Sequence, residues 1–122
     1  MGRVQLTTSE LDGVTVVQVE GELDKVGIDQ ARSSLDRLVG PGKLVVDLDR
    51  VTFIDSAGLH ALFGLARLAA PAGGSVALVV ADESPTARVI GLVHLSDVMP
   101  VLPTVEDAVG ALRQVSRDDA AG

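Results

Sequence analysis

The sequence predicts a single small α/β domain: a mixed, mostly parallel sheet of about five strands with about four helices packed against it. Two nearly continuous aliphatic runs, residues 43–48 and 76–81, are typical of strands covered on both faces. Segments with the apolar spacing of amphipathic helices alternate with these runs, which is the arrangement that builds parallel sheets. The chain has 122 residues, 47% of them hydrophobic, which is enough for one core but not for a second domain.

The first predicted element is a β-hairpin. Residues 4–8 alternate between apolar and polar side chains, and residues 14–19 are rich in β-branched side chains. The pair Asp12-Gly13 between them is a strong turn signal. We therefore expect two antiparallel strands at the start of the sheet.

Two helices follow the hairpin, separated by the strand at 43–48. The first ends at Gly40-Pro41-Gly42, and its apolar face contains Ile28, Ala31, Leu35, Leu38 and Val39. The second is predicted from Ser56 to about Ala70, because Pro71 removes a backbone donor. At 100° per residue, the arc expected to face the sheet contains Leu59, Leu62, Phe63, Leu65 and Ala66. The opposite stripe contains His60, Gly64 and Arg67, with Ala57, Ala61 and Leu68 beside them. This outer face is lightly charged and suits docking.

Two more helices and a short strand complete the predicted fold. The third helix begins at Ser84-Pro85, a capping residue followed by proline at the first helical position, and runs to about Leu95. Residues 98–102 fit only a sheet edge, because Pro100 cannot donate to a ladder. Thr104 caps the fourth helix, which runs from 105 to about 115. The predicted domain is residues 1–116, followed by a frayed polar tail at 117–122.

Composition excludes several classes of function. Ten Lys and Arg against 17 Asp and Glu give a net charge of −7, and the chain has no Trp and no Tyr. It therefore lacks the basic groove and the aromatic platform that bind nucleic acid. The absence of Cys excludes disulfides and thiolate zinc sites. No apolar run approaches the ~18 residues of a membrane span, and the first residues form no signal core, so we expect a cytoplasmic protein with no membrane partner.

The segment from residue 45 to residue 59 carries the strongest functional signal. It predicts a buried strand, a short acidic turn, a second apolar stretch and a helix start, which either Asp55 or Ser56 can cap. Gly58 lies in the first turn of that helix, where glycine costs about 1 kcal/mol relative to alanine. Close packing on the sheet would explain this glycine, and so would access for a partner protein.

Enzyme and ligand-binding interpretations have less support. Ser56, a histidine and an aspartate could form a triad, but Ser56 lacks the flanking glycines of a nucleophile elbow and His60 lies on the outer stripe. A phospho-acceptor aspartate domain needs acids at the end of the first strand and a late lysine, which this chain lacks. Asp24, Asp49 and Asp55 could meet at one sheet edge, yet solvated acids are ordinary there. We expect no catalytic residue, no metal and no cofactor.

Several motifs, in order along residues 4 to 115, give the chain a resemblance to the STAS domain, in particular to the stand-alone bacterial anti-sigma factor antagonists. The most specific is Asp55-Ser56-Ala57-Gly58-Leu59 behind an aliphatic strand. Weaker matches are Gly21-Glu22-Leu23-Asp24, the strand ending at Asp47-Leu48, the helix containing Arg88, and Thr104-Val105-Glu106-Asp107-Ala108. One departure is His94, which stands where the family commonly has a glycine at the end of the third helix.

The resemblance implies a function in transcription regulation. In that family the serine matching Ser56 is phosphorylated by a partner that is both an anti-sigma factor and a serine kinase. Only the unphosphorylated antagonist binds this partner and frees the sigma factor. The family's acidic residue near the phosphorylation site maps to Asp24. We expect the partner to bind around Ser56, at Asp24, Asp55, Ala57, Gly58, His60, Gly64 and Arg67, and the protein to be a monomer or a weak dimer. The alternative is a STAS scaffold or signalling-complex subunit that is not phosphorylated.

Overall fold

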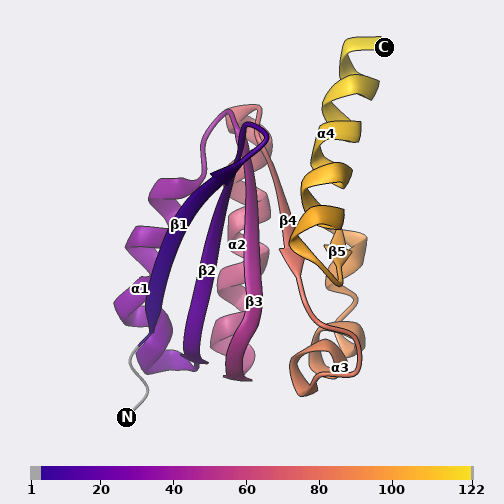
Figure 1. Cartoon of the computed structure of the whole chain (residues 1–122). Coiled ribbons are helices and arrows are strands. Elements are labelled where there is room, and N and C mark those ends of the chain that lie inside the picture. Colours follow the sequence, from indigo (N-terminus) through magenta and orange to yellow (C-terminus); the bar gives the residue numbers. More distant parts are fainter. Residues whose placement is uncertain (1–3, 122) are drawn as a thin grey trace.

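The structure is a computed structural model that describes residues 4–121, with the backbone alone for residues 115–121. It confirms the predicted α/β class. One five-stranded sheet has the order β1-β2-β3-β4-β5, in which β1 is antiparallel to β2 and the other neighbours are parallel (Figure 1). The strands are β1 (Gln5–Leu11), β2 (Val14–Leu23), β3 (Lys43–Ile54), β4 (Ser75–Val79) and β5 (Val101–Leu102). The helices are α1 (Lys25–Leu38), α2 (Ser56–Ala72), α3 (Pro85–Leu92), the 3-10 turn η1 (Leu95–Asp97) and α4 (Val105–Ala121).

The predicted hairpin is confirmed, and its strands are longer than the sequence suggested. Asp12 and Gly13 have φ values of 53° and 81°, the left-handed conformation that a two-residue type I′ turn requires at both positions. Leu11 and Val14 are paired next to the turn, and the pairing continues without a register shift to Gln5 and Glu20.

Strand β3 is continuous where the sequence predicted a strand, an acidic turn and a second stretch. Asp49 and Arg50 lie within it as exposed strand residues. The register between β2 and β3 shifts twice, between Gln18 and Glu20 and again between Gly21 and Glu22. These irregularities interrupt the alternation of buried and exposed residues without ending the strand. The predicted turn at this position was therefore wrong.

The ends of three helices also differ from the prediction. Helix α2 continues through Pro71 to Ala72 and ends at Gly73, which has a left-handed φ of 79°. Pro71 lies in the last turn, where a missing backbone donor costs a single hydrogen bond. Helix α3 ends at Leu92 instead of Leu95, and α4 continues to Ala121, so the predicted tail is helical through residue 121. Residue 122 lies outside the described residues.

His94 and the last strand show why the region after α3 was difficult to predict. His94 has a φ of 56°, so it adopts the left-handed conformation that a glycine would take more easily. The turn η1 follows, and within the predicted strand at 98–102 only Val101 and Leu102 are paired with residues of β4. The predicted strand at 98–102 is therefore shorter and begins after Pro100.

Two apolar clusters occupy the two faces of the sheet. The larger one lies under α1, α2 and α3. The smaller one lies between the sheet and α4, and is formed by Val14, Val16, Val45, Ala77, Val79, Ala108, Val109 and Leu112. Helix α4 contacts β3, β4 and β5, and no helix covers β1 on this face in the part of the chain that the structure describes (Figure 1). No described helix is long and apolar enough to cross a membrane.

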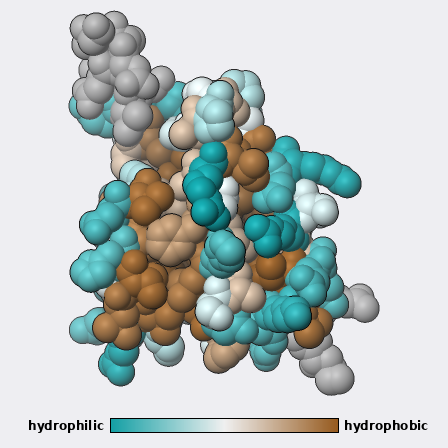
Figure 2. All heavy atoms as spheres, turned by 180° about the vertical axis from the view of Figure 1, so that it is seen from behind, coloured by the Kyte–Doolittle hydropathy of each residue, from teal (hydrophilic) through white to brown (hydrophobic). Residues whose placement is uncertain are grey.

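Apolar side chains are unevenly distributed on the surface. Viewed from behind, Figure 2 shows them gathered at the lower left, over the region of α3 and η1. The large exposed hydrophobic residues there are Leu92, Val93 and Val98. The other large exposed hydrophobic residues are Leu11, Val26, Phe53 and Leu68, and single apolar side chains on a protein surface are usual.

Asp47 is a charged residue in the middle of the sheet, with 6% of its surface exposed. Its Oδ1 accepts a hydrogen bond of 3.0 Å from the backbone N–H of Asp49. Burial raises the pKa of Asp47 above its ordinary value, and the nearby Asp49 charge acts in the same direction. The hydrogen bonds from the Asp49 backbone and Gln18 oppose this increase without cancelling it. The native state therefore holds the Asp47 proton more tightly than the unfolded chain does.

We expect Asp47→Asn to change the pH dependence of stability. Because the folded pKa is raised, the contribution of Asp47 to the stability of the wild-type protein falls as the pH rises from about the unfolded value, 3.8, through the folded value. Asparagine keeps an acceptor oxygen for Asp49 and has no charge to desolvate. The unfolding free energy of the variant minus that of wild type should therefore increase across this window and level off above it. Urea unfolding between pH 3.5 and 8 measures the difference, and a constant difference across that range would contradict the assignment.

Candidate functional site

Two aspartates lie on neighbouring strands at the carboxyl edge of the sheet. Asp24 follows β2 and Asp55 follows β3, and the last residues of these parallel strands, Leu23 and Ile54, are paired. The backbone N–H of Asp55 also donates to the carbonyl of Leu23, at 3.3 Å. Adjacent parallel strands thus place the two side chains on neighbouring strand ends. Both aspartates are half-buried.

Each aspartate caps a helix. Asp24 Oδ1 accepts a 2.8 Å hydrogen bond from the backbone N–H of Gly27 at the start of α1. Asp55 Oδ1 accepts from the backbone N–H groups of Ala57 and Gly58, at 2.9 and 3.1 Å, at the start of α2. Negative charge at these positions is favoured by the dipoles of the two helices. An aspartate N-cap therefore fixes the start of both helices.

Ser56 is the first residue of α2 and is exposed. The sequence left open whether Asp55 or Ser56 caps this helix, and the structure assigns the cap to Asp55. The Ser56 side chain is thus released from the capping role that most serines at such junctions have. An exposed hydroxyl at a helix N-terminus can accept a phosphate, because the helix dipole there favours negative charge.

Gly58 is buried and explains how α2 approaches the sheet. A Cβ atom at this position would collide with the carbonyl oxygen of Leu23 and lie 2.8 Å from Ile54 Cγ1. Close packing therefore accounts for the glycine, which was the commoner of the two explanations from the sequence. Gly27 has the equivalent position in α1, where a Cβ would collide with the carbonyl oxygen of Glu22.

The outer face of α2 agrees with the predicted stripe in part. His60 and Arg67 are exposed, whereas Ala57 and Gly64 are half-buried. Gly64 faces α1, since a Cβ there would lie 3.7 Å from an Arg32 side-chain nitrogen. Ala61, predicted beside the outer stripe, is 5% exposed and belongs to the core. The helix is rotated from the expected orientation, and its buried residues are Gly58, Ala61, Leu62, Leu65 and Ala69.

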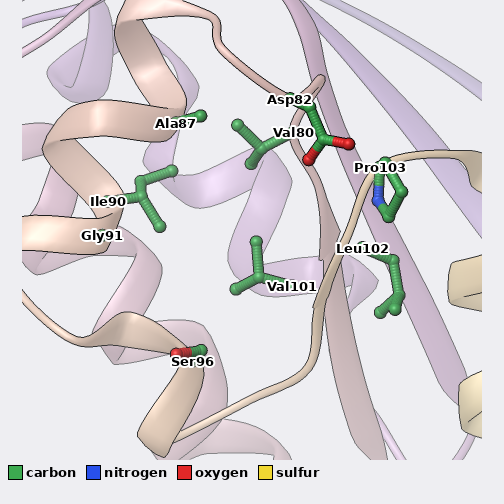
Figure 3. A pocket seen from close by; sticks show the side chains of 9 residues that line it. All are labelled: Val80, Asp82, Ala87, Ile90, Gly91, Ser96, Val101, Leu102 and Pro103. Carbon is green, nitrogen blue, oxygen red and sulfur yellow. The ribbon is translucent and has the colours of Figure 1, made fainter.

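A pocket of about 250 Å³ lies beyond β4, between α3 and the segment that leads from β5 into α4 (Figure 3). Its walls are mainly apolar, with Val80, Ile90 and Val101 among them, and Asp82 supplies a carboxylate. No sequence motif marks this pocket, because its lining residues come from four separate segments, at residues 80–82, 87–91, 96 and 101–103. Its volume is below the range of about 300–1,000 Å³ that is usual for small-molecule sites.

Metal ligands do not converge in the described part of the chain: it contains no group of three or more His, Asp or Glu side chains that could hold an ion. Asp24 and Asp55 are both engaged at helix starts. Asp49 instead accepts a 3.0 Å hydrogen bond from the backbone N–H of Ala81, which ties the end of β4 to β3. The three aspartates considered from the sequence therefore have separate structural roles.

The family model of the STAS domain matches residues 5–108, and the chain belongs to this family. It is 32% identical to the anti-sigma-F factor antagonist RsfB of Mycobacterium tuberculosis over 113 residues, 90% of each protein. A crystal structure of an anti-sigma factor antagonist from Mycobacterium paratuberculosis superimposes with a TM-score of 0.75 at 32% identity, covering 90% of this chain and 94% of the other. The Bacillus cell fate determinant SpoIIAA in its phosphorylated form gives a TM-score of 0.57 at 26% identity, covering 88% and 97%.

Proposed function

We propose that this protein is an anti-sigma factor antagonist controlled by phosphorylation of Ser56. In this proposal the unphosphorylated protein binds an anti-sigma factor with serine kinase activity and releases the sigma factor. The observation that carries the proposal is the exposed Ser56 at the start of α2, free of the capping role because Asp55 performs it. The names of the relatives support the antagonist function, and the phosphorylated form of SpoIIAA supports a phosphorylated state.

Phosphorylation would act on the interface and leave the fold intact. A phosphoserine adds about −1.5 to −2 charge at neutral pH, and the helix N-terminus tolerates that charge. The hydrogen bonds that start α2 are made by Asp55, so modification of Ser56 breaks none of them. The added charge must instead be desolvated when a partner covers the site, which is costly unless the partner supplies a compensating group.

The proposed partner surface surrounds Ser56 and extends along α2. It contains Asp24 and Asp55 at the sheet edge, with Ala57, His60, Gly64 and Arg67 on the helix. Gly58 is buried, so it supports this surface by letting α2 lie close to the sheet, and does not contact the partner directly. The proposal assigns no catalytic step to these residues. Its partner holds a sigma factor, which places the interaction in the bacterial cytoplasm.

The test is phosphate incorporation by the cognate kinase. Ser56→Ala should abolish incorporation and retain binding, because alanine removes the acceptor oxygen without adding charge. Ser33→Ala is the matched control, since Ser33 is an exposed serine in the middle of α1. Mass spectrometry of protein from native cells should locate the phosphate on Ser56. Phosphate on another residue, or none under any growth condition, would instead favour a STAS scaffold that is not phosphorylated.

A further inference from the structure

Strand β1 forms an unprotected edge of the sheet. Its seven residues pair with β2 on one side, and among the described residues no strand lies on the other side (Figure 1). Its one charged residue is Glu10 near the turn, and it contains no Pro, no Lys and no bulge, which are features that commonly protect edge strands. The opposite edge, β5, has only two residues and is contacted by α4. The long free edge is therefore confined to β1.

A groove runs beside this edge, between β1 and α1. Its volume is about 380 Å³, and its lining residues are Val4, Leu6, Thr8, Gln30, Ala31, Ser34 and Leu38. Val4, Leu6 and Leu38 are partly buried hydrophobic residues that pack against the main core. None of the lining residues is charged, although 22% of the chain is charged. Depletion of charge is characteristic of the central part of protein interfaces.

The hairpin geometry identifies which backbone groups are free at the edge. In a hairpin closed by a two-residue turn, the residues next to the turn exchange both hydrogen bonds, and such pairs then alternate along the ladder. Leu11 and Val14 flank the turn, so the odd-numbered residues of β1 bond to β2. The N–H and C=O groups of Leu6 and Thr8 therefore point outward. Their side chains lie on the α1 side, in the groove.

We propose that a second copy of this chain pairs with β1, antiparallel and with Leu6 opposite Leu6. This register aligns Val4 of each copy with Thr8 of the other, so that one row of uncharged side chains covers both grooves. A register centred on Thr8 would instead place Glu10 opposite Leu6 and bury a carboxylate in that row. The edge is thus self-complementary in one register, and the partner is identified by that symmetry. The proposal is independent of the function of Ser56.

The dimer should be weak and should respond to salt. Each copy has a net charge of −7, so two copies repel one another at low ionic strength. Salt screens that repulsion, whereas the uncharged contact itself is insensitive to it. Sedimentation equilibrium of the whole protein should therefore show a dimer whose dissociation constant falls as NaCl is raised from 20 to 300 mM. A protein that remains monomeric at millimolar concentration in 300 mM NaCl would overturn the proposal.

Two substitutions at Thr8 test the edge. Thr8→Pro removes an outward N–H and leaves the ladder to β2 intact, so it should weaken the dimer at least tenfold without changing the circular dichroism spectrum. Thr8→Val is the matched control, since it keeps the N–H and should preserve the dimer. If Thr8→Pro does not fold, Thr8→Lys replaces it, because it puts a charge into the pairing row. An unchanged dimer in the folded variant would overturn the proposal.

Cross-linking tests the register, and the absence of native cysteines makes the background clean. Leu6→Cys should form an intermolecular disulfide under mild oxidation, because directly opposed residues have Cα atoms about 5.5 Å apart, within disulfide range. Residue 10 lies outside the paired segment, so Glu10→Cys should form much less of the intermolecular disulfide. Efficient cross-linking at residue 10 and not at residue 6 would overturn the register and with it the self-complementary edge.

Discussion

Phosphorylation of Ser56 is expected to lower the affinity for the cognate anti-sigma factor about a thousandfold, which corresponds to about 4 kcal/mol. The size of this loss of affinity follows from the penalty for burying one uncompensated charge in an interface, which is a few kcal/mol. The expected change in thermal stability is small, because Asp55 makes the capping hydrogen bonds and the helix dipole favours the phosphate. Isothermal titration calorimetry of the phosphorylated and unphosphorylated forms measures the first effect, and thermal unfolding the second.

A charge control separates a local effect from an effect of net charge. Ser33→Asp adds a negative charge at an exposed position of α1 that is two turns from its N-terminus. It should leave partner affinity within about threefold of wild type if the surface charge is solvated and screened. An equal loss of affinity with Ser33→Asp would show that overall charge governs binding. Unchanged affinity of the Ser56 phosphoprotein would contradict the proposed switch itself.

Gly58→Ala is expected to destabilise the domain by about 1–3 kcal/mol, the usual cost of overpacking a core. The new methyl group would meet the backbone carbonyl of Leu23 and the side chain of Ile54. A backbone carbonyl cannot rotate away as a long side chain can, so α2 must shift outward from the sheet. Urea unfolding followed by circular dichroism measures the loss.

Gly64→Ala in the same helix is the matched control for stability alone, because Gly64 also belongs to the proposed partner surface, and its effect on stability should have the opposite sign. Its Cβ would make an ordinary contact of 3.7 Å with Arg32, so the helix propensity of alanine should stabilise the domain by up to about 1 kcal/mol. If Gly58→Ala is as stable as wild type yet binds the partner less well, the glycine serves partner access and not packing. The pair of variants thus tests the packing explanation, which the contacts of Gly58 support, against partner access.

The fold was predictable because local and tertiary signals agree. The aliphatic runs predicted the central strands, and Asp12-Gly13 predicted the hairpin, and the strand pairing confirms both. The continuous β3 strand was not predictable, because a register shift between neighbouring strands depends on their pairing and not on either segment alone. The rotation of α2, which buries Ala61, was missed because tertiary packing decides which side of a nearly uniformly apolar helix faces the sheet.

The position of the site was predictable, but its hydrogen bonds were not. The segment around Ser56 stands out in the sequence by its composition, whereas aspartate and serine are nearly equal as capping residues. Which of the two residues caps α2 depends on where the backbone leaves the extended conformation. Asp55 is still extended, with φ −116° and ψ −170°, so its side chain and not that of Ser56 receives the amide donors.

The β1–β2 turn has a practical consequence for handling the protein. Asp12 and Gly13 lie at the end of the sheet opposite to the start of α2, since β2 begins beside this turn and finishes beside Ser56 (Figure 1). A fluorophore or an affinity tether attached at the turn would therefore project away from the proposed partner surface. Immobilisation through this point leaves Ser56 accessible to both a kinase and a binding partner.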